Sequence, residues 1–343
     1  MLEKSLFIRA LRRQPVSRTP VWIMRQAGRY LPEYLAVRKQ AGDFMTLCRT
    51  PELACEVTLQ PLRRFELDAA ILFSDILTIP DAMGLGLSFV EHEGPKFANP
   101  IRDVSMIERL PGADCIEDLR YVFDAAKLIR QNMPADLPLI GFSGSPWTLA
   151  CYMLEGQSTR EFKHAFKWAY DEPLALHLLL NKLTDAVIVY LGQQIEAGVN
   201  AVMLFDTWGG VLTPELYQTF SLPYMAKIVQ ALKAKYPTIP SIMFTKGGGQ
   251  WLDAMANTGV DALGVDWTCD MAYVSRLVGH KVALQGNLNP AVLRATPAVI
   301  REEVKKVLSA FGSGPGHIFN LGHGITPDVP PDNVAVMIEA VRA

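Results

Sequence analysis

Eight short apolar segments, each followed by a polar or glycine-rich turn, recur along this chain of 343 residues. Apolar runs of three to five residues bounded by turn signals are typical of strands buried on both faces of a parallel sheet. The runs cover residues 21–24, 69–73, 139–142, 201–205, 242–244, 262–265, 282–284 and 318–321. Parallel neighbours need a long crossover connection, and amphipathic stretches of suitable length separate these runs.

Those amphipathic stretches predict the helices, at residues 51–65, 116–131, 161–197, 214–235, 271–278, 290–311 and 331–342. Proline opens several of them, and Gly198 and Gly312 follow two of them as C-terminal caps do. Eight strand–helix alternations predict an α/β protein, a single (β/α)8 TIM-type barrel over residues 1–343. In the insertion at residues 80–111, the alternation at residues 87–91 predicts a hairpin.

The overall charge argues against several classes of partner. The 33 basic and 35 acidic residues leave a formal charge of −2, whereas a nucleic-acid-binding protein needs a basic footprint. The most apolar helix candidate, residues 177–195, is interrupted by Lys182 and Asp185, so we expect no membrane span. Five cysteines without a C-x-x-C pair fit thiols in a reducing compartment, which favours the cytoplasm.

Residues 21–34, VWIMRQAGRYLPEY, concentrate fixed positive charge directly after the first predicted strand. Arg25 and Arg29 stand four residues apart, and a guanidinium pairs bidentately with carboxylate or phosphate. Gly28 between them permits a bend or a close approach of the backbone. The pattern indicates a receptor for a multiply anionic ligand. The alternative interpretation is a surface turn whose arginines pair with nearby Asp or Glu, because the spacing alone fits both.

In a (β/α)8 barrel the active-site cleft lies at the C-terminal ends of the strands, so the residues after each run are the site candidates. They are Arg25, Arg29, Asp75, Ser143, Tyr152, Phe205, Asp206, Thr207, Trp208, Lys246, Asp266, Gln285, Asn287, Asn320 and His323.

Several candidates also have a structural interpretation. Asp75 can cap the helix after it, and for Asp206 a cap or an internal ion pair is the preferred interpretation. His323 lies between two glycines and can be a base, a ligand donor or a loop residue. Tyr152 lies on a predicted helix, where a tyrosine is more often part of the core. Lys246 stands where a barrel enzyme can carry a Schiff-base lysine, so spacing alone leaves that chemistry open.

Eight blocks of the chain, in order, match one known family. They are PVWIMRQAGRYLPEY, ILFSDILTIPDAMG, GFSGSPWTLACYM, FDTWGG, FTKGGG, GVDW, QGNLNP and NLGHGI. By these blocks the chain resembles the uroporphyrinogen decarboxylase family over essentially its whole length. The resemblance implies a homodimeric (β/α)8 barrel that converts the four acetate side chains of uroporphyrinogen III to methyls. The products are coproporphyrinogen III and four CO2, formed without metal or organic cofactor.

The resemblance also implies roles for single residues. Arg25 and Arg29 match carboxylate-clamping arginines, and Asp75 matches an aspartate that faces the pyrrole N–H groups. Asp75, Arg25 and Tyr152 are implied to be catalytic. The positions implied to bind substrate, with no metal ligand among them, are Arg25, Gln26, Ala27, Gly28, Arg29, Arg38, Asp75, Tyr152, Phe205, Thr207 and His323.

The chemistry implied for Asp75 requires an ionised carboxylate. We expect nearby arginines and N–H donors to lower its pKa against the upward effect of burial. The proton donor stays open among Arg25, a bound water and another acid, because a guanidinium with a pKa above about 12 is a poor acid.

Two other functions remain as alternatives. The first is a zinc-dependent corrinoid or thiol methyltransferase of the same superfamily, whose His and Cys ligands would follow the fifth and eighth strands. Those places hold Lys246 and His323, and Cys269 is the nearest cysteine in sequence, which disfavours zinc. The second is a non-catalytic tetrapyrrole carrier, which would keep the arginines but would not need Asp75.

Overall fold

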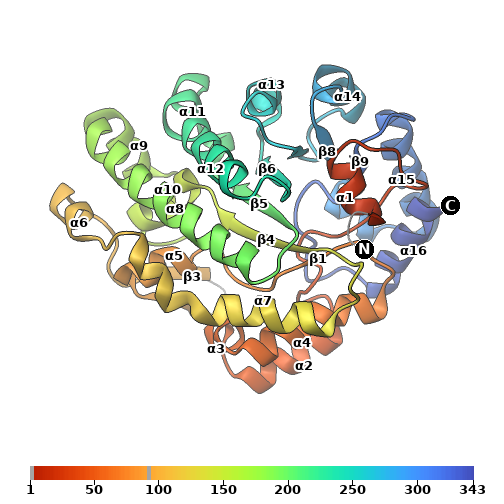
Figure 1. The fold of residues 1–343 in the computed structure, drawn as a ribbon, viewed down its shortest axis with the longest axis horizontal. Coiled ribbons are helices and arrows are strands. Elements are labelled where there is room, and N and C mark those ends of the chain that lie inside the picture. The colour runs from red at the N-terminus through yellow and green to blue at the C-terminus, as the bar shows by residue number, and fades with distance from the viewer. Residues whose placement is uncertain (1–3, 91–93) are drawn as a thin grey trace.

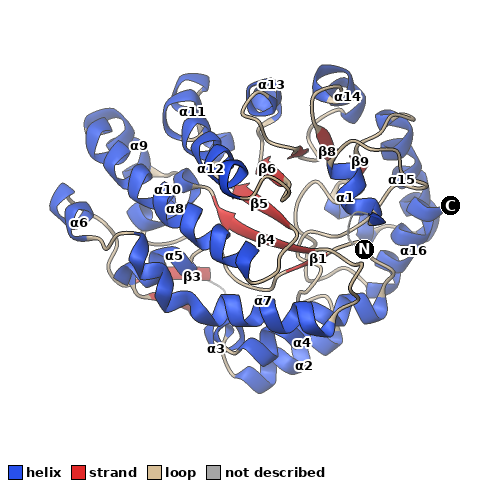
Figure 2. Ribbon diagram, viewed as in Figure 1, coloured by secondary structure: helices blue, strands red, loops and turns tan. Residues whose placement is uncertain are grey.

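A computed structural model describes residues 4–90 and 94–343 of the chain. Within these residues the central element is a curled, entirely parallel sheet of seven strands in the order β1-β4-β5-β6-β7-β8-β9 (Figure 2). The strands are β1 Ala70–Ile71, β4 Leu139–Gly144, β5 Ala201–Asp206, β6 Ser241–Thr245, β7 Ala262–Gly264, β8 Ala283–Gln285 and β9 His317–Ile318. Seven of the eight predicted strands are therefore confirmed, with ends shifted by at most three residues.

The first predicted strand, residues 21–24, is not a regular strand. Val21 forms an isolated parallel bridge with Phe319 beyond β9, and its carbonyl accepts the Asp68 N–H at 2.8 Å on the β1 side. The Met24 N–H donates to the Asn320 side chain at 2.9 Å instead of to a neighbouring backbone. The segment thus contacts both edges of the sheet, but side chains replace most of a strand ladder, so the sheet itself has seven strands and not eight.

Helices cover the outside of the curled sheet (Figure 1). Confirmed near their predicted bounds are α4 Pro51–Arg64, α14 Met271–Val278 and α16 Pro331–Arg342, and a 3-10 turn at Ala113–Leu119 leads into α7 Arg120–Asn132. Gly198, with φ +111°, follows α10, and Gly312, with φ +89°, follows α15, as their predicted capping roles require.

Three predicted helices are in fact broken. Residues 161–197 form α9 Lys163–Asp171 and α10 Pro173–Glu196, residues 214–235 form α11 Pro214–Phe220 and α12 Leu222–Lys235, and residues 290–311 form a 3-10 turn at Pro290–Arg294 followed by α15 Pro297–Phe311. Proline lies at the first or second position of α10, α12 and α15, where it begins a helix but cannot continue one.

Several short helices had no counterpart in the prediction. They are α1 Leu6–Leu11, α2 Pro32–Ala41, α3 Phe44–Arg49, α6 Val104–Arg109 and α13 Leu252–Ala256. The helix expected around Tyr152 is α8 Pro146–Glu155, and the helix expected after Asp75 is the short α5 Thr78–Pro80. The predicted hairpin is confirmed as β2 Leu87–Val90 paired antiparallel with β3 Gly94–Phe97, and its expected end at Glu91 lies outside the described residues.

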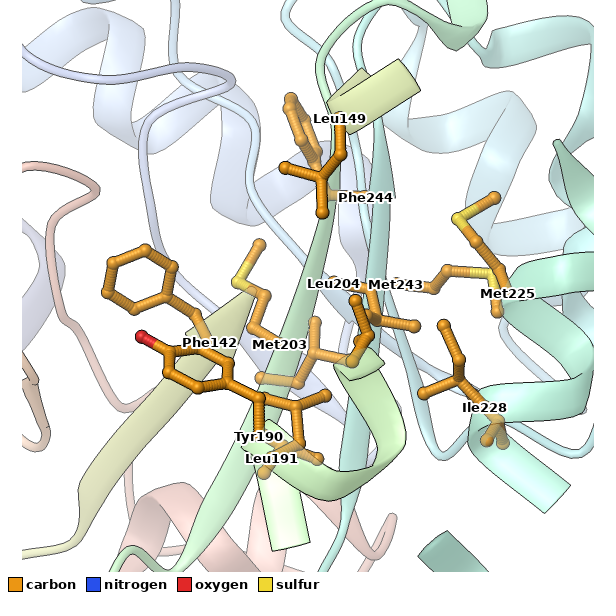
Figure 3. Close-up of a cluster of buried hydrophobic side chains, with 14 of the residues drawn as sticks. Phe142, Leu149, Tyr190, Leu191, Met203, Leu204, Met225, Ile228, Met243 and Phe244 are labelled. Carbon is orange, nitrogen blue, oxygen red and sulfur yellow. The ribbon is translucent and has the colours of Figure 1, made fainter. Parts of the chain in front are cut away.

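The core lies between the sheet and the helices that cover it. Every residue of β4 and β6 is buried, which accounts for their continuous apolar sequences. Figure 3 shows one part of this core, where Leu204 of β5 and Met243 of β6 lie among side chains of α10 and α12 such as Tyr190 and Ile228. Rigid strands packed in this way fix the positions of the loops that follow them.

Within the described residues, one helix is long and apolar enough to cross a membrane by length and composition. It is α10, with a mean hydropathy of 1.5 over its most apolar window. Over half of that window, 56%, is buried inside the molecule. In the fold α10 packs on β4, α8 and α12, as a central helix of the outer layer does.

Candidate active site

The loops at the carboxyl ends of the strands bring the predicted site residues together. Arg25, from the segment that bridges β9 and the β1 side, acts electrostatically on Asp75 after β1, Tyr152 on α8 and His323 beyond β9. Lys246 after β6 also acts on His323. These five residues come from distant parts of the chain, and their convergence agrees with the rule that barrel sites lie at strand ends.

Arg25 sits in an unusual backbone conformation, with φ +67°. Gly324 makes room for its side chain, because a Cβ on Gly324 would lie 2.4 Å from Arg25 Cδ. Part of the Arg25 side chain reaches solvent, yet protein surrounds most of it, and this burial lowers the pKa of its guanidinium. No carboxylate of the described residues lies within 4.0 Å of Arg25 or Arg29. The interpretation as a surface turn with locally paired arginines is therefore wrong.

Hydrogen bonds of Gln26 hold the loop that carries Arg25 and Arg29. Its buried side chain accepts the Ile23 N–H at 3.2 Å and donates to the Ala69 carbonyl at 3.3 Å, and its backbone carbonyl accepts the Tyr30 hydroxyl at 2.9 Å. Gly28 lets the loop turn tightly, since a Cβ there would lie 2.9 Å from the Arg25 carbonyl. Gln26 thus has a structural task that the sequence did not indicate.

Arg38 lies on α2, the helix that follows the loop of Arg25 and Arg29. Its guanidinium carbon is 5.9 Å from the centre of the Phe44 ring, and no carboxylate of residues 4–90 or 94–343 lies within 4.0 Å of it. Arg38 and Arg29 both act electrostatically on Tyr34, so the positive charges of this segment lie near one another.

Asp75 does not cap the helix after it, because Leu77 is the N-cap residue of α5 and that helix has no side-chain cap. One Asp75 carboxylate oxygen instead accepts the Leu77 N–H at 2.8 Å and fixes the turn before α5. Burial raises the pKa of Asp75 to about 6, against the lowering effects of the Leu77 N–H and Arg25. Our expectation of a lowered pKa is wrong for the free protein, because one N–H and an arginine beyond salt-bridge distance do not offset desolvation.

Tyr152 and Phe205 lie among other aromatic rings. The centre of the Tyr152 ring is 6.0 Å from that of Trp208. Phe205 lies near the end of β5, two residues before Thr207, and its ring centre is 5.6 Å from that of Phe142 and 6.2 Å from that of Phe244. Burial raises the pKa of the Tyr152 hydroxyl, so that group stays protonated.

His323 is a neutral imidazole at physiological pH. Burial lowers its pKa to about 4, and the positive charges of Arg25 and Lys246 contribute. The ring lies 6.1 Å from Phe244 and 6.0 Å from Trp267. His323 can therefore offer single hydrogen bonds to a ligand, but it does not add a positive charge.

Asp206 differs from both of its predicted roles. It is fully buried and accepts hydrogen bonds from four hydroxyls, and among residues 4–90 and 94–343 it neither caps a helix nor forms an ion pair. The donors are Ser145 at 2.6 Å, Thr148 at 3.1 Å, Ser221 at 2.8 Å and Thr245 at 3.2 Å. Burial raises the pKa of this carboxyl. The network joins β5, β6, α8 and the α11–α12 junction at the residue before Thr207.

Three amide and carboxylate side chains at other strand ends hold loops in place. Asp266 accepts the Gly247 N–H at 3.0 Å, Asn320 accepts the Met24 N–H, and Gln285 accepts the Trp22 indole N–H at 2.8 Å. Each was predicted only as a polar residue at a strand end, and their partners tie them to the loops that carry Lys246 and Arg25.

Two cavities of the molecule are lined by other residues. A cavity of about 640 Å³ lies before β1 and β4, at the other end of the sheet, with Arg63, Asp68 and Leu137 in its lining. A second, of about 310 Å³, borders Gly247 and Cys269. Among residues 4–90 and 94–343, no three or more His, Cys, Asp or Glu side chains are grouped so as to hold a metal ion.

In the described part of the chain, a curled parallel sheet gathers at its strand ends arginines with no carboxylate within 4.0 Å, a half-buried aspartate and a neutral histidine, which defines an α/β protein with unpaired positive charge at these ends. The family model of uroporphyrinogen decarboxylase (URO-D) matches residues 2–343, and the chain belongs to that family.

Named relatives are similar over nearly the whole length. The uroporphyrinogen decarboxylase of Legionella pneumophila subsp. pneumophila strain Philadelphia 1 is 70% identical over 341 residues, 99% of this chain and 97% of that protein. The protein of the same name from Pseudoalteromonas atlantica is 59% identical over 343 residues, again 99% and 97%.

Two solved structures share the fold. A methyltransferase from Methanosarcina mazei superposes with a TM-score of 0.83 at 21% identity, covering 99% of this chain and 98% of that one. A B12-independent methionine synthase from Shewanella sp. W3-18-1 gives a TM-score of 0.56 at 13% identity, covering 85% and 87%. At these identities the likeness concerns the fold alone.

Proposed function

We propose that this protein converts the four acetate side chains of uroporphyrinogen III to methyls, releasing four CO2 and coproporphyrinogen III in porphyrin and haem biosynthesis. The observation that carries this function is the match, over nearly the full length and at 59–70% identity, to proteins named uroporphyrinogen decarboxylase. The geometry supports it, because Arg25 and Asp75 act on each other at the strand ends.

Substrate binding rests on the arginines. Arg25, Arg29 and Arg38 have no carboxylate partner within 4.0 Å in the described part of the chain, so each is available for a substrate carboxylate. Ala27 and Gly28 take part through the loop backbone. Gln26 acts mainly by holding that loop, since both ends of its amide are already bonded.

The reaction needs an electron sink, because loss of CO2 from an acetate otherwise leaves an unstabilised carbanion. Protonating the pyrrole carbon beside the acetate gives a cation that accepts the electron pair as CO2 leaves. A proton then adds to the side-chain carbon to form the methyl, and the ring carbon loses the proton it gained. The sum for each acetate is one carboxylate and one proton converted to CO2 and a methyl.

Asp75 supplies the countercharge in this scheme. With a pKa of about 6 it is largely ionised near neutral pH, and a developing positive charge on the pyrrole stabilises its ionised form further. Fixed charges at a site shielded from water stabilise such an intermediate more strongly than water does. Tyr152, Phe205, Thr207 and His323 complete the contacts, the tyrosine and histidine as hydrogen-bonding groups.

Two pKa shifts bear on which residue donates the proton. His323 has a pKa of about 4 and carries no imidazolium to give. Burial lowers the pKa of Arg25, so its guanidinium is a better acid here than in water. Arg25 thus combines carboxylate binding with a lowered cost of proton release.

The remaining features of the proposal concern assembly. Residues 21–24, bonded to both edges of the sheet, act as the eighth strand and complete a (β/α)8 barrel within one domain of residues 1–343. We further propose a cytoplasmic homodimer that needs no cofactor and binds neither nucleic acid nor membrane. Size-exclusion chromatography with light scattering measures the dimer directly.

The test is anaerobic incubation of metal-stripped protein with chemically reduced uroporphyrinogen, followed by chromatography of the oxidised porphyrins. The expected result is a ladder from eight to four carboxylates with the wild type and none with a still-binding Asp75→Asn variant. Binding without CO2 release by the wild type would favour a tetrapyrrole carrier. Neither binding nor turnover, with methyl transfer on adding zinc, would favour the methyltransferase alternative.

A further inference from the structure

Lys246 is a second source of positive charge at the strand ends. It directly follows β6, and its ammonium nitrogen lies 5.7 Å from the centre of the Trp208 ring, which is itself 6.0 Å from Tyr152. Its charge acts on His323 together with that of Arg25. No carboxylate in the described part of the chain lies within 4.0 Å of the ammonium. Lys246 is thus a half-buried cation inside the site, and no described residue is its anionic partner.

The backbone around Lys246 is fixed from two sides. Its N–H donates to the Asp206 carbonyl at 3.2 Å, and the next residue, Gly247, donates to Asp266 at 3.0 Å. Gly210 approaches so closely that a Cβ there would lie 2.0 Å from the Lys246 carbonyl. The Asp266 carboxylate also accepts hydrogen bonds from the Thr268 backbone N–H and hydroxyl, so this acidic group serves the loop.

The topology places Lys246 across the sheet from the arginines. The segment at Val21 contacts Phe319 beyond β9 on one side and Asp68 before β1 on the other. In either direction around the sheet, three strands separate β6 from that segment: β1, β4 and β5 on one side, and β9, β8 and β7 on the other. Arg25, Arg29 and Arg38 all follow the Val21 segment, and Lys246 follows the strand opposite to it.

We propose that Lys246 binds a carboxylate of the substrate on the side of the macrocycle opposite to the one held by the three arginines. This inference rests on the proposed function, whose substrate carries acetates and propionates around its whole perimeter. Cations on one side of the site would leave the far carboxylates without partners. A lysine is a compact charge on a flexible stem, so it suits an acetate and a propionate equally as the macrocycle is turned for successive decarboxylations.

Steady-state kinetics with uroporphyrinogen, under anaerobic conditions, test this role. Lys246→Gln removes the charge, Lys246→Arg keeps it, and Lys227→Gln makes the same charge change on the outer helix α12, where Lys227 pairs with Asp185. We expect Lys246→Gln to raise KM about tenfold or more with a smaller change in kcat, because a hydrogen bond to a charged group is lost. Lys246→Arg should stay within about threefold of the wild type, and Lys227→Gln should match it. The increase of KM with salt should also be weaker in Lys246→Gln.

The outcomes separate this inference from the function itself. A wild type that releases no CO2 overturns the proposed function, and the role of Lys246 with it. An active wild type with an unchanged KM in Lys246→Gln overturns the role of Lys246 alone. If Lys246→Arg raises KM as much as Lys246→Gln and both lower the thermal midpoint, the lysine supports the loop and the proposal is wrong.

Discussion

Replacing Asp75 by asparagine should make the folded protein more stable at neutral pH while it abolishes decarboxylation. Burial raises the pKa of Asp75 from 3.8 to about 6, which corresponds to about 3 kcal/mol at about 1.4 kcal/mol per pKa unit. The folded state carries this cost whenever the carboxylate is ionised. Asparagine removes the charge and keeps an oxygen that accepts the Leu77 N–H, so most of the cost disappears.

The sign of the pH dependence follows from the direction of the shift. Because the folded pKa lies above the unfolded one, the folded state binds more protons between pH 3.8 and about 6. The wild type therefore has its full relative stability below 3.8 and loses it as the pH rises through about 6. The advantage of Asp75→Asn should be complete above that range and should vanish below it.

Equilibrium urea denaturation of both proteins across this pH range measures the difference in the free energy of unfolding. Asp118→Asn, the same change at an exposed position before α7, serves as the control for the substitution itself. Porphyrin chromatography on the same samples reports activity. A stability difference independent of pH, an Asp75→Asn variant less stable than the wild type at neutral pH, or retained CO2 release would each refute the reasoning.

Three further predictions concern other parts of the site. In a pH–rate profile, kcat/KM should rise through about pH 6 as Asp75 ionises. His323, with its pKa of about 4, should add no second limb near neutrality. A profile flat between about pH 5 and about pH 7 would contradict this. Gly324→Ala should lower kcat/KM about 100-fold with an unchanged circular dichroism spectrum, because the new Cβ displaces the Arg25 side chain, and wild-type kinetics would argue against that placement. Asp206→Ala should cost more than about 3 kcal/mol in urea denaturation, since four hydroxyl donors lose their acceptor, and a loss below about 1 kcal/mol would mean that water replaces it.

The sequence alone determined the alternation of strands and helices. Burial on both faces imposes a continuous apolar run, and β4, β5 and β6 were found from that pattern because it is local. The rule that sites lie at strand ends then selects Arg25, Asp75 and Lys246 from the sequence alone. Pro173 and Pro297 also mark the helix breaks in the sequence. The breaks were missed because the amphipathic periodicity continues across them.

The tertiary structure decided the features that depend on distances between remote residues. The Met24 N–H donates its hydrogen bond to the Asn320 side chain instead of to a neighbouring backbone, which is one reason why residues 21–24 are not a regular strand, and Asn320 lies about 300 positions away along the chain. The four hydroxyls around Asp206 come from three separate segments, so no spacing in the sequence reveals them. The raised pKa of Asp75 reflects the protein packed around it, because desolvation depends on everything nearby. Local periodicity encodes which residues are buried, whereas charge states and partners are set only when the whole chain has folded.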